Sequence, residues 1–315
     1  MKIALFGHPV GHSRSKDLFD ALAAAGGPRV EYEPVDVPPE RFGEALARLR
    51  DGEWDGANVT VPHKRAAAAA ADLLEPFAAR CGAANVLARR GGGALVGANT
   101  DGLGFLDALS LLDAPASRGL AGGGAANRAL AGGTAASRGL AGGTAANRGL
   151  AGGTAANRAL VLGAGGAAAA VVAALVETGR AVAVATRDPE RARRDVPLAA
   201  EALAWDDPRL SVVAGAAGLV VQATPLGTAP RVDEAPPFDP AWFAPGARAV
   251  DLIYNPWETR WLRLARARGV AALNGWPMLV RQAARSLAFW GLGEAAEALV
   301  EASTTVEPRD PRRAS

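Results

Sequence analysis

The feature that most limits how this chain can fold is an alternation of strand-like and helix-like segments in its first third and again after Arg158. Short apolar runs, such as residues 56–62, alternate with segments of helical spacing, such as 15–27. Residues 64–77 are predicted to form one helix, and residues 84–102 a hairpin with a glycine turn. Strands separated by helices at this spacing predict an α/β protein with mostly parallel sheets.

A second constraint is the segment that follows Arg158. A predicted strand at 159–163 leads through Gly163-x-Gly165-x-x-Ala168 into a predicted helix that ends at Gly179. Such a turn lets the backbone approach a pyrophosphate at a helix N-terminus, so Gly163, Gly165 and Gly166 are predicted to hold a dinucleotide. This predicts a Rossmann-type domain.

The end of the next predicted strand bears on which dinucleotide is bound. Where an NAD site would place an acidic residue, about 20 residues after the glycines, this chain has Thr186 and Arg187. An arginine suits a 2′-phosphate, which favours NADP(H) as the cofactor. The alternative is an exposed arginine after a strand, with no role in binding.

A ten-residue repeat with arginine at 118, 128, 138, 148 and 158 precedes this segment. Each full unit carries one leucine and a glycine pair, too little to build a continuous core, so residues 113–158 are predicted to be a flexible linker. The alternative, an arm that binds nucleic acid, lacks the interleaved aromatic residues typical of such arms.

The first third places polar side chains just after predicted strands. They are Ser13, Ser15, Asn58, Thr60, Lys64 and Asp101. Residues past the carboxyl ends of strands in an α/β sheet converge, and this set suits a small polyhydroxylated anion. Lys64 is one of only three lysines, and with Asp101 it could pass a proton to a carbonyl oxygen as hydride arrives. The alternative is a surface ion pair without chemistry.

Composition excludes several other classes. A formal charge of +2 gives no general argument for nucleic acid or a membrane surface, and no apolar run approaches the ~20 residues of a spanning helix. The N-terminal apolar run is too short for a signal peptide, and the single cysteine fits a reducing compartment, so a cytoplasmic protein is expected. The spacing of His8, His12 and His63 does not favour a metal site, and Cys81 is expected to be a buried thiol.

Taken together, the motifs resemble the shikimate dehydrogenase family over nearly all of the chain except the repeat and the tail. The segments that carry the resemblance are GHSRS, NVTVPHK, GAANVL, NTDG, VLGAGGAA, ATR, QATPLGT, DLIYNPWETRWL and NGWPMLVRQA. The resemblance implies a substrate-binding domain at 1–112, completed by a C-terminal helix at 275–302, and a Rossmann NADP-binding domain at 159–274. The repeat linker at 113–158 is absent from relatives and is predicted from its composition, as is a disordered tail at 303–315, which is polar and contains prolines.

The resemblance also implies a reaction, the reversible NADPH-dependent reduction of 3-dehydroshikimate to shikimate in aromatic amino-acid biosynthesis, with Lys64 and Asp101 as the catalytic pair. The substrate would be held by Ser13, Ser15, Asn58, Thr60, Asn85, Tyr254 and Gln282. The cofactor would be held by Gly163, Gly165, Gly166, Ala167, Thr186, Arg187, Thr224, Gly275 and Met278.

The chain departs from the family pattern at a few positions. Lys16 stands in place of proline, Phe19 and Asp20 in place of a His-Asn pair, and Thr186 in place of asparagine. A quinate/shikimate dehydrogenase using NAD(P) and a non-catalytic paralogue that binds NADP or substrate therefore remain alternatives. No metal, nucleic acid or membrane partner is expected, and the protein is expected to be a monomer or a homodimer.

Overall fold

The computed structural model describes residues 1–11, 13–112 and 155–306. These residues fall into two compact units, the first made of 1–104 with 279–306 and the second of 105–278. The predicted linker lies outside the described residues up to position 154. Ala155–Asn157 form a short 3-10 turn directly before the first strand of the second unit.

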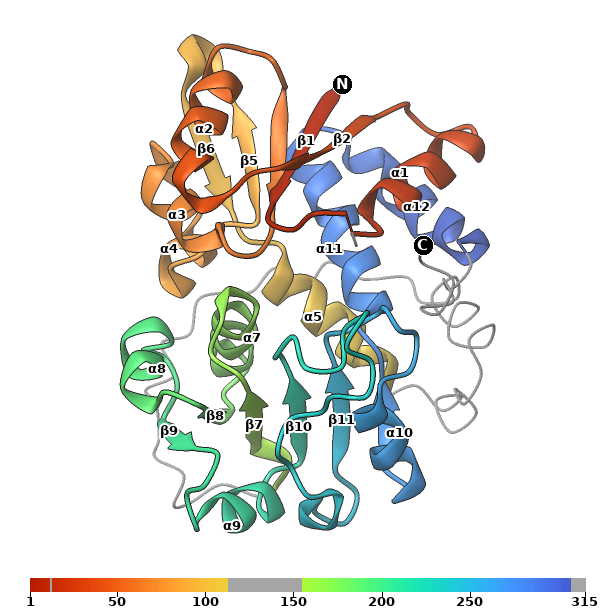
Figure 1. Cartoon of the computed structure of the whole chain (residues 1–315). Helices are drawn as coiled ribbons and strands as arrows, with labels where there is room; N and C mark the ends of the chain where they lie inside the picture. The colour runs from red at the N-terminus through yellow and green to blue at the C-terminus, as the bar shows by residue number, and fades with distance from the viewer. Residues whose placement is uncertain (12, 113–154, 307–315) are drawn as a thin grey trace. The chain divides into compact units, whose positions relative to one another are not determined.

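The first unit is built on a six-stranded sheet (Figure 1). Its strands are β1 (Lys2–Gly7), β2 (Glu31–Asp36), β3 (Gly56–Val59), β4 (Leu73–Leu74), β5 (Val86–Arg89) and β6 (Leu95–Ala98). They lie in the order β2-β1-β3-β5-β6-β4. β5 runs antiparallel to both β3 and β6, and the remaining pairs are parallel. The predicted hairpin is confirmed as β5 and β6.

Side chains of the first unit alternate between the two faces of its sheet, as the pleat requires. Ala57 and Val59 pack in a core with α2 (Phe42–Arg50) and α3 (Lys64–Ala70). Asn58 lies between them in the strand, so its side chain is on the other face, where its Nδ2 donates to Ser286 Oγ at 3.3 Å. The remaining helices of this unit are α1 (Ser15–Ala24), α4 (Pro76–Cys81), the start of α5 (Asp101–Leu109), most of α11 (Trp276–Phe289) and α12 (Ala296–Ala302).

The single helix predicted for residues 64–77 is wrong. The chain leaves α3 at Ala71, forms the short strand β4 and starts α4 at Pro76. Asp72 explains the break, because its backbone N–H donates to Leu95 O at 2.9 Å and its carboxylate accepts from Leu95 N at 2.7 Å. The proline also disfavours helical geometry at the residue before it.

The C-terminal segment predicted as one helix over 275–302 forms two helices. α11 ends at Phe289, and Gly291 follows with φ of +89°, a left-handed conformation typical of a helix stop. α12 then ends in a 3-10 turn at Ser303–Thr305, in which Ser303 is fully buried, so residues 303–306 are not part of a disordered tail. The rest of the predicted tail lies outside the described residues.

The second unit has an entirely parallel six-stranded sheet in the order β12-β11-β10-β7-β8-β9. Its strands are β7 (Arg158–Leu162), β8 (Ala181–Thr186), β9 (Glu201–Ala204), β10 (Leu219–Gln222), β11 (Arg248–Asp251) and β12 (Ala271–Leu273). In chain order this is the 3-2-1-4-5-6 arrangement of a Rossmann fold, whose strand order reverses between β7 and β10. The predicted α/β architecture with parallel-rich sheets is confirmed.

Helices cover both faces of this sheet. α7 (Gly166–Glu177) and α8 (Pro189–Asp195) pack in a core with Val161 and Val184. α9 (Leu210–Gly215) and α10 (Arg260–Ala267) pack in the opposite core with Leu160 and Ala183. Figure 1 shows α7 and α8 beside β7 and β8 in this unit.

Candidate active site

The topology of the first sheet explains why residues far apart in sequence meet at the same end of its strands. β3 and β6 point the same way, so their carboxyl ends, at Val59 and Ala98, lie at the same end of the sheet. β5 runs in the opposite direction, so Asn85, directly before it, lies at this end as well. The sequence motifs 58–64, 85 and 99–101 therefore converge, as the position of active sites in α/β sheets leads one to expect.

Lys64 and Asp101 form a close ion pair at this end of the sheet. Lys64 lies in the first turn of α3, Asp101 in the first turn of α5, and Lys64 Nζ is 2.7 Å from Asp101 Oδ2. The two side chains are 12% and 8% exposed, so the pair is shielded from solvent. Asn99 fixes the start of α5, because its Oδ1 accepts from the backbone N–H groups of Asp101 (3.0 Å) and Gly102 (3.4 Å).

Asn85 connects the ion pair to helix α11. Its Nδ2 lies 3.0 Å from Asp101 Oδ1, 2.9 Å from Thr100 Oγ1 and 3.2 Å from Gln282 Oε1. Its Oδ1 accepts from the backbone N–H of Thr100 at 2.7 Å. Buried polar groups of this kind are costly unless they are paired, so the network holds the side chains in defined orientations.

Of the other predicted substrate residues, all but Tyr254 lie in the first unit. Ser13 and Ser15 come just before and at the start of α1, and the Ser13 hydroxyl donates to Ser15 Oγ at 3.2 Å. Thr60 follows β3, and its backbone N–H donates to Phe6 O at 2.8 Å. Asn58 is buried at the end of β3. Tyr254 belongs to the second unit, where it follows β11.

Two residues of this network were missed from the sequence. Thr100 hydrogen bonds with Asn85 and lies 3.2 Å from Ser286 Oγ, and Ser286 is fully buried. Ser286 comes one helical turn after Gln282 on α11, and that spacing was the available signal.

His8, His63 and Cys81 have ordinary structural environments. His63 is buried, its Nε2 lies 2.6 Å from Val37 O, and its ring stacks on Phe42. His8 Nδ1 lies 3.0 Å from Asp36 Oδ2, and His12 lies outside the described residues. Burial raises the pKa of the Cys81 thiol to about 11, which keeps it protonated and unreactive at neutral pH.

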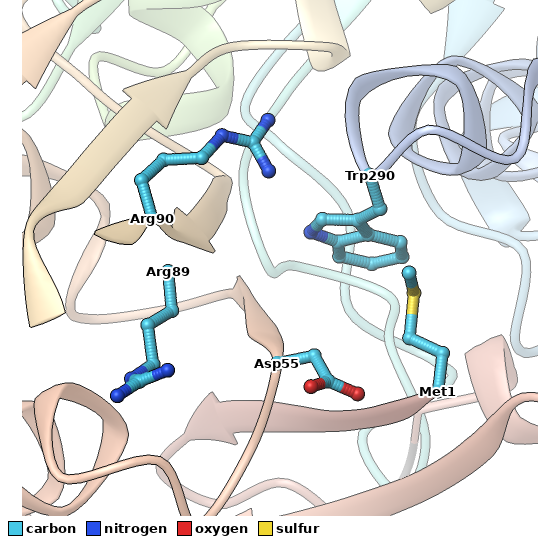
Figure 2. A pocket seen from close by; sticks show the side chains of 5 residues that line it. All are labelled: Met1, Asp55, Arg89, Arg90 and Trp290. Atoms are coloured by element: carbon cyan, nitrogen blue, oxygen red, sulfur yellow. The ribbon is translucent and has the colours of Figure 1, made fainter. Parts of the chain in front are cut away.

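A cavity of about 290 Å³ in the first unit contains none of the predicted site residues. It is lined by Met1, Asp55, Arg89, Arg90 and Trp290, and Figure 2 shows the two arginine side chains pointing in different directions. Its polar groups already have partners in the protein: Arg90 donates to Phe289 O and Trp290 to Leu87 O. This cavity is therefore separate from the predicted active-site residues.

The second unit carries the predicted cofactor loop at the end of β7. Gly163 has φ of +112°, and a Cβ there would lie 3.1 Å from backbone atoms of Ala223, which follows the neighbouring strand β10. Gly165 is the N-cap of α7 and has no heavy atom within 4 Å of the position its Cβ would take. Gly166 and Ala167 form the first turn of this 12-residue helix. An open glycine at a helix N-terminus leaves room for a phosphate to approach the backbone.

The end of β8 also fits a phosphorylated dinucleotide. Arg187 is exposed directly after this strand, and Thr186 is its last residue. The next residue, Asp188, accepts from Arg191 N at 2.9 Å as the N-cap of α8. An arginine without a competing ribose-binding acid suits a 2′-phosphate.

The remaining predicted cofactor residues have defined places in the second unit. Thr224 follows β10, and its backbone N–H donates to Gln222 Oε1 at 2.6 Å. A Cβ at Gly275 would lie 2.1 Å from Leu252 O, so this position leaves no space for a side chain. Met278 packs in the core of this unit.

Asp251, at the end of β11, was not singled out from the sequence. It is fully buried; its Oδ1 accepts from Ile253 N at 3.0 Å and its Oδ2 from the Thr259 hydroxyl at 2.5 Å. Burial raises its pKa to about 7, against the effect of these two hydrogen bonds. Thr259 is the N-cap of α10, so Asp251 ties the loop that carries Tyr254 to this helix.

Within residues 1–11, 13–112 and 155–306, no three His, Cys, Asp or Glu side chains are grouped so that they could hold a metal ion. None of the helices in that part of the chain is both long and apolar enough to span a membrane.

Comparisons with known proteins identify the family of this chain. The family model for the shikimate dehydrogenase substrate binding domain matches residues 5–87. The shikimate dehydrogenase (NADP(+)) of Moorella thermoacetica is 37% identical over 95% of this chain and 90% of its own length. That of Methylobacterium radiotolerans is 39% identical over 90% of this chain and 89% of its own length.

A solved structure with the same fold carries both ligands. The crystal structure of shikimate 5-dehydrogenase from Thermus thermophilus in complex with NADP(H) and shikimate has a TM-score of 0.70 and 32% identity, and the match covers 96% of this chain and 99% of that one.

Proposed function

Because this chain belongs to the shikimate dehydrogenase family, we propose that it catalyses the reversible NADPH-dependent reduction of 3-dehydroshikimate to shikimate. The observation that carries the proposal is the shielded ion pair of Lys64 and Asp101, in which Nζ lies 2.7 Å from Oδ2. The pair lies at the end of the sheet where polar residues converge. A lysine beside a carboxylate can give up and take back a proton, which an arginine cannot do.

Lys64 and Asp101 carry the proton transfer. In the direction of reduction, the Lys64 ammonium donates a proton to the carbonyl oxygen of 3-dehydroshikimate while the carbonyl carbon receives hydride, and the product is the alcohol. In the direction of oxidation, the pair takes the hydroxyl proton back. Asp101 keeps the ammonium in place, and Asn85 keeps Asp101 in place through the 3.0 Å hydrogen bond to Oδ1.

The polar residues around the pair orient the substrate. Six residues of the first unit are proposed to contact its carboxylate and hydroxyls: Ser13, Ser15, Asn58, Thr60, Asn85 and Gln282. Tyr254, which belongs to the second unit, is proposed as a further substrate contact. Neutral hydroxyls and amides arranged around one ion pair suit a small molecule with several hydroxyl groups and a single acidic group. Holding such a substrate in one orientation supplies much of the rate enhancement.

The residues of the second unit fit NADP(H). Gly163, Gly165 and the start of α7 would hold the pyrophosphate, because the backbone there is open to a ligand and the helix N-terminus attracts negative charge. Arg187 would hold the 2′-phosphate, while Ala167, Thr186, Thr224, Gly275 and Met278 would complete the cofactor site. Bound NADPH supplies the hydride.

The remaining expectations are also proposals. The chain is organised as a substrate domain at 1–112 with the helix at 275–302 and an NADP domain at 159–274, and the segment at 113–158 links them. It acts in the cytoplasm, as a monomer or a homodimer, on a small-molecule substrate.

A direct test is NADPH formation by the purified protein with shikimate or quinate as the alcohol and NADP or NAD as the acceptor. We expect turnover of shikimate with NADP and little turnover of quinate. With NAD, kcat/KM should be at least tenfold lower, since NAD lacks the 2′-phosphate proposed to bind Arg187 and a single charge-assisted hydrogen bond is worth about this factor. Preferred turnover of quinate with NAD would instead indicate a quinate dehydrogenase. Binding of shikimate without turnover of any pair would indicate a non-catalytic paralogue.

A further inference from the structure

Ser286 is a junction between three elements of the first unit. It lies on α11, is fully buried, and its hydroxyl donates to the carbonyl oxygen of Gln282 one turn earlier, at 2.9 Å. Asn58 Nδ2, from the end of β3, lies 3.3 Å from its Oγ. Thr100 Oγ1, from the residue before α5, lies 3.2 Å from the same oxygen.

A count of hydrogens gives this junction a direction. A serine hydroxyl has one hydrogen, and that of Ser286 is donated to Gln282 O. Ser286 Oγ is then an acceptor for both Asn58 and Thr100. The Thr100 hydroxyl also lies 3.3 Å from Asn85 Oδ1 and 3.4 Å from Gln282 Oε1, and its contact with Ser286, at 3.2 Å, is the shortest of the three, so we take Thr100 as the donor of this pair. With its hydrogen directed at Ser286, the Thr100 oxygen is left to accept from Asn85 Nδ2 at 2.9 Å.

This direction decides which way the Asn85 amide faces. The amide nitrogen that donates to Thr100 is the one that lies 3.0 Å from Asp101 Oδ1. The reversed amide would place its oxygen against the Asp101 carboxylate, where the two acceptors would repel each other. The Thr100 backbone N–H holds the same orientation by donating to Asn85 Oδ1 at 2.7 Å, and Ser286 adds to it through the Thr100 hydroxyl.

Tyr32 holds the same network from the opposite side. Its hydroxyl donates to Asn58 Oδ1 at 2.9 Å, and its ring stacks on Phe19 with centroids 4.5 Å apart. The Asn58 nitrogen donates to Asn85 O at 3.2 Å as well as to Ser286. Both hydrogens of the Asn58 amide are therefore used inside the protein.

We propose that Ser286 is a positioning residue for the reaction, which orients Asn85 through Thr100 and, together with Tyr32, holds Asn58 in place. This inference rests on the function proposed above and assigns a role to two residues that do not themselves hold the substrate.

The test is the variant Ser286→Ala in the full-length protein, assayed with shikimate and NADP. We expect kcat/KM for shikimate to fall about tenfold, with the KM for NADP unchanged within twofold, since one buried hydrogen-bonding partner is worth about this factor.

Tyr32→Phe is the second variant, because it removes one hydroxyl and keeps the ring that stacks on Phe19. Combined with Ser286→Ala it should lower kcat/KM by less than the product of the two single effects, since both act on Asn58. The matched control is Ser303→Ala, which removes a fully buried hydroxyl of the same unit that donates to Val300 O, and it should leave the kinetic constants unchanged within twofold.

The outcomes separate this inference from the proposed function. A wild-type protein without turnover would overturn the proposed function itself. An active wild type, with Ser286→Ala and Tyr32→Phe lowering only the melting temperature and leaving kcat/KM for shikimate unchanged, would overturn the positioning role alone.

Discussion

At the scale of single residues, Asp251 shows how burial alone changes the behaviour of a carboxyl group. It lies fully buried at the end of β11 with a pKa of about 7, and two hydrogen-bond donors do not offset the loss of solvent. Its unfolded pKa is near its ordinary value of about 3.9. The folded protein therefore keeps a proton on Asp251 over a pH range in which the unfolded chain has lost it.

This difference predicts how stability changes with pH. A raised folded pKa contributes stability that is complete below about pH 4 and is lost as the pH rises to about 7, at up to ~1.4 kcal/mol per pH unit. Wild type should thus lose about 2–3 kcal/mol relative to Asp251→Asn between pH 5 and pH 7, as measured by denaturant unfolding. Parallel pH dependence in the two proteins would contradict the raised pKa.

Some site residues could be predicted from the sequence, because their positions follow from strand ends. Lys64 and Asp101 come just after predicted strands, and a rare lysine near a carboxylate indicates proton transfer. Thr100 and Ser286 could not be predicted from strand ends, because their contact depends on α11 returning to the first unit after more than 170 residues. The family resemblance implied that return, and the spacing of Ser286 one turn after Gln282 was then the only local signal.

At the scale of elements, two glycines that look alike in sequence have different reasons to be glycine. Gly165 has open space at its Cβ position and an ordinary φ of −81°. Gly275, at the junction of β12 and α11, would place a Cβ 2.1 Å from Leu252 O and 2.4 Å from Leu252 C. The first position is free for a ligand, and the second is filled by the backbone after β11.

Alanine substitutions at these two positions should therefore have opposite effects. Gly165→Ala should leave the melting temperature nearly unchanged but raise the KM for NADP about tenfold, because the methyl group occupies space that the pyrophosphate needs. Gly275→Ala should destabilise the protein by about 3 kcal/mol or more, since backbone atoms cannot move aside cheaply. Thermal unfolding and NADP kinetics on both variants check this, and a stable Gly275→Ala protein would contradict the crowding.

The boundaries of elements were predictable only where local signals agreed with tertiary contacts. The alanine-rich run at 66–71 favours a helix, and α3 forms there, but Asp72 pairs with Leu95 and the chain turns into β4. The helix propensity of the run carries no information about that strand pairing. The turn at Gly91–Gly93 was predictable, because three glycines between two apolar runs leave few other conformations.

At the scale of the whole chain, the alternation of strands and helices was enough to predict the α/β class, and the glycine turn after β7 was enough to predict a Rossmann fold. The strand order of the first unit was not predictable, because β5 and the short β4 enter the sheet through contacts between distant segments. The family resemblance is confirmed by relatives that match over more than 90% of the chain.

Lys64, paired with Asp101, is proposed to transfer the proton in an NADP-linked oxidation of shikimate. The most direct measurement compares wild type with Lys64→Ala in two assays, NADPH formation from shikimate and NADP, and shikimate binding by calorimetry. We predict that the variant remains folded and still binds shikimate, while kcat falls by a factor of roughly 10²–10⁴, which is the usual contribution of a positioned acid-base group. A variant that binds shikimate and turns it over at the wild-type rate would show that Lys64 does not transfer the proton.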